Sequence, residues 1–143
     1  MVDQDVVLEK VASIQRCLRR IQEKTNLDPS SLDDVDVQDI VVLNLQRAIQ
    51  SAVDLAAHVI AEEGLGLPRS LKEHFELLSN SGVISDEVAA RMQAMVGFRN
   101  IAVYEHERID VHVLKTILTK HLQDLVLLYR EVLNHCGLGE QPG

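Results

Sequence analysis

Large aromatic rings are almost absent from this sequence, which has no tryptophan and only 3% aromatic residues among its 143 positions. Its core must therefore be built from leucine, valine, isoleucine, alanine and methionine, a mixture that suits helices packed on helices. The length suits one domain whose core needs neither disulfides nor a metal. We expect a single all-α domain over residues 1–143, with flexible tails at 1–3 and 138–143.

Cysteines and long apolar runs are also lacking. Cys17 and Cys136 stand near opposite ends of the chain, without the paired spacing of a zinc site or a disulfide framework. No apolar run approaches the ~20 residues needed to cross a bilayer. The N-terminus lacks the basic region and apolar stretch of a secretory signal. These absences predict a cytoplasmic protein with no membrane span.

Positive charge is in deficit, with 14 Lys and Arg against 22 Asp and Glu and a formal net charge of −8. Because counterion release needs clustered cations, this composition argues against a surface that grips nucleic acid by charge alone. Any contact with nucleic acid must be local. The best group for steering a phosphate lies on the first expected helix, although a solvated face would show the same pattern: Arg16, Arg19, Arg20 and Lys24.

Hydrophobic periodicity predicts an up-down bundle of about five helices. Turn residues, glycines and candidate N-caps such as Ser85 set their ends. The expected helices cover residues 4–24, 37–63, about 70–80, about 86–106 and 110–135, with a loop over 25–36.

The second expected helix is apolar on two adjacent stripes, so it must be covered on more than one side, at the centre of the bundle or at a subunit interface. A polar stripe runs beside them: Asn44, Arg47, Ser51, Asp54 and His58. One interpretation is a solvated edge. The other is one wall of a polar cleft, in which Asp54 and Arg47 orient groups brought by another helix.

On the fourth expected helix, the spacing of Val88, Met92 and Met95 continues to Arg99. A guanidinium on this inward-facing stripe needs a carboxylate partner or a cavity that binds an anion. Seven residues later, His106 would return to the same face about 10 Å along the axis. Two copies related by a two-fold axis would let an arginine and a histidine converge on one phosphate, which predicts a homodimer.

These residue types suit cleavage of an RNA phosphodiester by its own 2′-hydroxyl, without a metal. His106 can shuttle a proton near neutral pH, Arg99 can stabilise charge on the phosphoryl oxygens, and Asn100 can donate and accept hydrogen bonds. A divalent cation is the alternative for the acidic and histidine cluster Glu105, His106, Glu107, Asp110 and His112, although its spacing matches no familiar site. We interpret His121 as a satisfied core or interface histidine.

The run 95–106 resembles the motif of the HEPN superfamily, an arginine and a histidine separated by four to six residues, and specifically its HepT-like toxin branch. The similarity extends to 43–47, to Asp54 with His58, to the Gly-Leu-Gly-Leu-Pro turn and to the last helix. This resemblance implies a helical bundle that dimerises to form a composite, metal-independent ribonuclease site, with no cofactor. It also implies a toxin neutralised by a minimal nucleotidyltransferase antitoxin.

Carried over by position, Arg99 and Asn100 match the start of the motif. HepT-like members usually read Arg, four residues, His, one residue, Tyr, where the tyrosine accepts AMP from the antitoxin. Here Tyr104 and His106 stand in exchanged order, which makes Tyr104 the candidate acceptor. Two alternatives remain open: a non-catalytic subunit that binds a nucleotidyltransferase, and a metal-dependent hydrolase that uses Glu105, His106 and His112.

Overall fold

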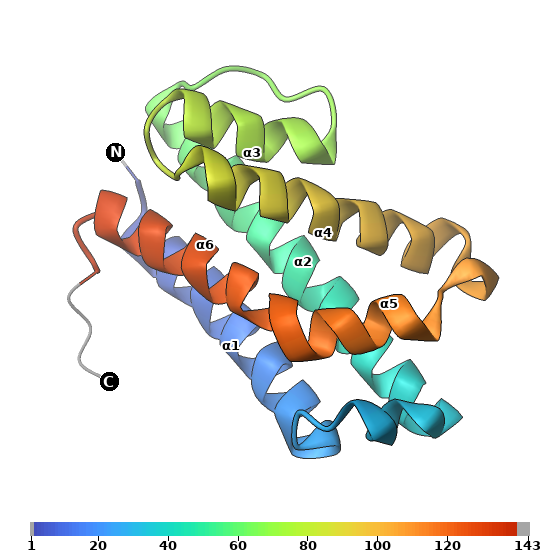
Figure 1. The fold of residues 1–143 in the computed structure, drawn as a ribbon. Helices are drawn as coiled ribbons and strands as arrows, with labels where there is room; N and C mark the ends of the chain where they lie inside the picture. The colour runs from blue at the N-terminus through green and yellow to red at the C-terminus, as the bar shows by residue number, and fades with distance from the viewer. Residues whose placement is uncertain (1, 140–143) are drawn as a thin grey trace.

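The computed structural model describes residues 2–139, and this part of the chain is helical with no strand (Figure 1). The C-terminal part of the expected tail, 140–143, lies outside the described residues. None of the helices of residues 2–139 is both long and apolar enough to cross a membrane. The elements are α1 (Gln4–Thr25), η1 (Pro29–Asp33), α2 (Val35–Glu63), α3 (Leu71–Asn80), α4 (Asp86–Tyr104), η2 (His106–Arg108), α5 (Val111–Thr116), η3 (Ile117–His121) and α6 (Leu122–His135).

Helix α2 lies at the centre of the bundle, in contact with α1, α3, α4 and α6. Both of its apolar stripes are buried, as the sequence predicts, with Leu45 and Ile49 fully enclosed. Most of the polar stripe is not a solvated edge, although Arg47 is exposed. Asn44 and Ser51 are buried, and the Ser51 hydroxyl lies 2.8 Å from that of Ser13 on α1. The stripe therefore faces α1 and forms part of the contact between the two helices.

Local capping explains why the helices begin where they do. The Ser85 hydroxyl accepts from the Val88 N–H at 3.2 Å, as expected for an N-cap, and Ser70 caps α3 in the same way. Asp3 falls in the expected N-terminal tail, but its carboxylate caps α1 and its N–H donates to Nε2 of His58. Gly64 ends α2 at a φ of 64°, a conformation that glycine adopts without strain.

The last expected helix is interrupted at its middle by the wide π-helical turn η3. Nδ1 of His121, at the end of this turn, lies 3.1 Å from Oδ2 of the buried Asp124. Arg91 of α4 donates to the other carboxylate oxygen at 3.0 Å. His121 is therefore satisfied, as the sequence predicts, and the ion pair ties α4 to α6.

Candidate functional site

Arg99 lies on α4 and reaches across to the central helix. Its Nη2 donates to Oε1 of Gln50 at 3.0 Å, and its Nη1 donates to Oδ1 of Asn100 at 3.3 Å. Its Nε is buried and has no hydrogen-bond partner within residues 2–139. No carboxylate of this part of the chain lies within ion-pair distance of the guanidinium, so only neutral amides hold its charge.

Gln50 in turn is fixed by Asp54, one turn further along α2. Nε2 of Gln50 donates to Oδ1 of Asp54 at 2.9 Å, which directs the Gln50 oxygen toward Arg99. Oδ2 of Asp54 lies 3.5 Å from Nζ of Lys10 on α1. Asp54 is therefore linked to the arginine of α4 through an intervening glutamine, and its role as a supporting cleft residue stays a prediction.

Sequence reasoning missed Gln50. It lies between the two apolar stripes and the polar stripe of α2, three residues after Arg47 and four before Asp54. Its helical spacing from Arg47 and Asp54 was the signal that could have identified it as a neighbour of these two residues. Its role depends on α4 packing against α2, which no local pattern reveals.

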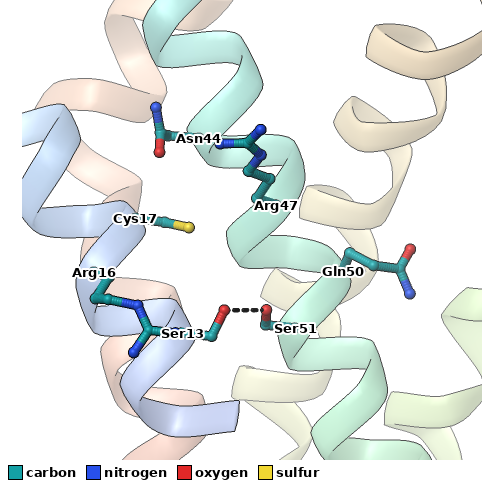
Figure 2. A pocket seen from close by; sticks show the side chains of 7 residues that line it. All are labelled: Ser13, Arg16, Cys17, Asn44, Arg47, Gln50 and Ser51. Carbon is teal, nitrogen blue, oxygen red and sulfur yellow. Dashed lines mark hydrogen bonds between the residues drawn. The ribbon is translucent and has the colours of Figure 1, made fainter. Parts of the chain in front are cut away.

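Arg47, expected to share the cleft with Asp54, makes no hydrogen bond or ion pair to it. Its exposed side chain lies instead beside a hollow between α1 and α2 (Figure 2). Gln50 lines the same hollow and points away from α1 in that view. The two predicted cleft residues therefore lie on either side of Gln50.

The expectation that His106 continues the inward face of α4 is wrong. Helix α4 ends at Tyr104, and His106 opens the short 3-10 helix η2 with an exposed side chain. The apolar spacing could not reveal this end, because neither glycine nor proline marks it. An exposed ion pair of 3.1 Å between Arg108 and Glu105 spans the turn.

Tyr104 is the last residue of α4, and its side chain is 74% exposed. Its hydroxyl is thus open to another molecule. By contrast, the cluster around Glu105 and His112 does not come together as a cation site. Within residues 2–139, no group of three or more His, Cys, Asp and Glu side chains is arranged to hold a metal ion.

A family model described as ribonuclease HepT-like matches residues 14–132. The chain belongs to the HepT-like family. It is 33% identical over 120 residues to the mRNA nuclease HepT of Shewanella oneidensis. The matched region covers 84% of this chain and 90% of that protein. The relationship suggested by the run 95–106 is thereby confirmed for most of the chain.

Solved structures agree with this assignment. The tri-AMPylated HEPN toxin of Shewanella oneidensis in complex with MNT antitoxin has a TM-score of 0.86 at 32% identity, covering 91% of this chain and 98% of that one. The cytosolic protein YutE of Bacillus subtilis has a TM-score of 0.82 at 13% identity, covering 99% and 96%, which shows the fold alone. The all-helical HEPN fold is therefore confirmed.

Proposed function

We propose that this HepT-like protein is an endoribonuclease toxin that cleaves RNA without a metal, at a site shared by the two subunits of a homodimer. One observation carries the proposal: the half-buried Arg99 guanidinium is held by two neutral amides and has no carboxylate partner among residues 2–139. A partly desolvated cation of this kind has no counter-charge until an anion binds to it, so it favours anion binding. A phosphodiester is the anion that the relatives' names indicate.

In the proposed reaction, the RNA 2′-oxygen attacks the adjacent phosphorus and the bond from phosphorus to the 5′-oxygen breaks. His106 accepts the 2′-hydroxyl proton and returns a proton to the departing 5′-oxygen. Arg99 stabilises the charge that develops on the non-bridging oxygens, and Asn100 orients the guanidinium. The products are a 2′,3′-cyclic phosphate and a 5′-hydroxyl, so this step consumes no external water.

The positions of these two groups favour a shared site. Arg99 precedes the end of α4 by five residues, or about 7.5 Å of helix, and it points toward α2. His106 lies beyond the helix end on an exposed turn, and no hydrogen bond joins it to Arg99. A two-fold axis would allow the arginine of one subunit to meet the histidine of the other.

The experiment that tests this function is incubation of RNA with the purified protein in EDTA. We expect cleavage to persist at the rate seen without chelator, and the fragments to end in 2′,3′-cyclic phosphates. Loss of cleavage in EDTA, with recovery on adding Mg²⁺ or Mn²⁺, would instead favour the metal-dependent alternative. If the wild-type protein cleaves no RNA, the result would favour the alternative function, a non-catalytic subunit that binds a nucleotidyltransferase.

We also propose that the protein is cytoplasmic and binds a minimal nucleotidyltransferase antitoxin, which transfers AMP to Tyr104. The related HEPN toxin is AMPylated in complex with its MNT antitoxin, and Tyr104 offers an exposed hydroxyl. The phenolic oxygen would attack the α-phosphorus of ATP and release pyrophosphate. After co-expression with the nucleotidyltransferase, mass spectrometry should place AMP on Tyr104 and none on the Tyr104→Phe variant. A neutralised complex with unmodified Tyr104 would contradict this.

The exchanged order of Tyr104 and His106 favours one second candidate, a non-catalytic subunit that only binds the nucleotidyltransferase. Both side chains are exposed, so exchanging them places no strain on the core. The fold would therefore survive even if the exchange had removed cleavage. The EDTA experiment separates the two functions.

A further inference from the structure

The hollow between α1 and α2 is a polar feature that the proposed reaction does not use. It has a volume of about 450 Å³, and its lining comes from two helices that Figure 2 shows side by side. Arg16 lies on the α1 side and Arg47 on the α2 side. A hollow of this size has room for a phosphate with its neighbouring sugar.

The two arginines carry uncompensated charge. Within residues 2–139, neither Arg16 nor Arg47 has a carboxylate within ion-pair distance or a hydrogen-bond acceptor. The carboxylate of Asp54, further along α2, is already bound to Lys10 and Gln50. In a chain of net charge −8, two free guanidiniums beside one hollow form a local positive site.

The thiol of Cys17 lies close to both of these charges. It projects from α1 toward α2 in Figure 2, and burial raises its pKa, while the Arg47 and Arg16 guanidiniums oppose that rise. Both guanidiniums therefore lie near enough to this thiol to favour its anionic form. The hydroxyls of Ser13 and Ser51 lie 2.8 Å apart, so one O–H donates to the other and the second remains available for an anion.

Gln50 connects the hollow to the proposed reaction centre. It lines the hollow, and the same side chain accepts from Arg99 of α4. Arg16, Arg47 and Arg99 thus lie on three helices, α1, α2 and α4, of which α1 and α4 both contact α2, and Gln50 of α2 links Arg99 to the hollow. An RNA strand carries a phosphate at every nucleotide, so a strand whose cleaved linkage lies at Arg99 has further phosphates available to a second cationic site.

We propose that the hollow binds a phosphate of the RNA backbone outside the cleaved linkage, with Arg16 and Arg47 on either side of it. The proposal rests on the proposed function, because it extends the substrate site from Arg99 toward α1. It gives this acidic protein a second contact with the strand. We assign the phosphodiester as the ligand because two uncompensated guanidiniums flank the hollow and its lining has no aromatic ring on which a base could stack.

The test measures binding of a single-stranded RNA of twelve nucleotides, 2′-O-methylated throughout so that the 2′-oxygen cannot attack. Fluorescence anisotropy gives Kd at several salt concentrations for the wild type and for Arg16→Gln, Arg47→Gln and the double variant. Arg130→Gln on α6 is the matched control, since it removes the same charge from an exposed position away from the hollow. Thermal melting verifies that each variant is folded.

We expect the double variant to bind about tenfold more weakly at physiological salt, with the slope of log K against log salt reduced by about 1.4, or about 0.7 per arginine. Each single variant should show half of that change in slope, and Arg130→Gln should match the wild type. Equal slopes for all proteins, an equal loss in Arg130→Gln, or no binding by the wild type would overturn the proposal.

Failure of this proposal and failure of the nuclease are distinguishable because the probe cannot be cleaved. A wild type that cleaves ordinary RNA, beside a double variant with unchanged Kd, would remove the hollow from the substrate site and leave the nuclease standing. If the wild type cleaves no RNA but its binding depends on Arg16 and Arg47, the nuclease function fails and the phosphate site in the hollow stands. If the double variant does not fold, the single variants decide.

Discussion

Arg99→Ala is expected to slow RNA cleavage by about 10²–10³-fold, the usual cost of removing one donor that stabilises a developing oxyanion. The effect should be large because Nη1 and Nη2 are already oriented by Asn100 and Gln50, so little reorganisation accompanies the reaction. The free energy of unfolding should change little, since the partners lost are neutral amides and no ion pair is broken. The measurement is the single-turnover cleavage rate in EDTA, with the melting temperature taken on the same sample.

The matched variant for this prediction is Arg99→Lys. It keeps the positive charge but cannot contact Gln50, Asn100 and a phosphoryl group together, so its rate should fall between those of the wild type and Arg99→Ala. An Arg99→Ala protein that is folded and cleaves within threefold of the wild-type rate would contradict the role given to the guanidinium.

His106→Ala is expected to lower the cleavage rate by about 10²–10⁴-fold, the range typical of a lost general acid or base. Its side chain is exposed on η2, so the change should leave the fold intact. His112→Ala is the control, because it removes another exposed imidazole, from α5, and should keep wild-type cleavage. Equal losses in the two variants would favour the metal-dependent alternative over proton transfer by His106.

Mixing the two inactive variants tests whether the site is shared. A heterodimer of Arg99→Ala and His106→Ala would carry both changes in one composite site and none in the other. Random exchange of subunits should therefore restore about a quarter of the wild-type activity, since half of the dimers would each contain one intact site. No recovery, after mass spectrometry has shown that heterodimers formed, would place both groups in the same subunit.

Much of the fold could be predicted from the sequence because its determinants are local. Ser85 fixes the start of α4 by bonding to an N–H three residues away, and the glycine at Gly64 ends α2. The two apolar stripes of α2 predicted a helix covered on more than one side, at the centre of the bundle or at a subunit interface, and the structure shows the central position. Such signals depend on a few neighbouring residues and survive without knowledge of the packing.

What the sequence could not provide depends on contacts between helices. The end of α4 at Tyr104 carries no glycine or proline, so the apolar spacing wrongly predicted that the helix continues to His106. The π-helical turn ends at His121, where the apolar rhythm of the last helix is interrupted, but one polar residue does not by itself indicate a change of helix type. Gln50 acquires its role only when α4 brings Arg99 against α2, and the pairing of Arg16 with Arg47 likewise requires α1 to lie beside α2.

The unequal support of Arg99 and His106 has a consequence for control. Arg99 is anchored in a 19-residue helix packed into the core, whereas His106 lies on a three-residue turn spanned by a surface ion pair that salt readily screens. Modest warming or a bound protein can displace such a turn while every core helix stays intact. An antitoxin that disturbs only these few peripheral residues would inhibit cleavage reversibly. The free energy that holds the helical core together would be unaffected.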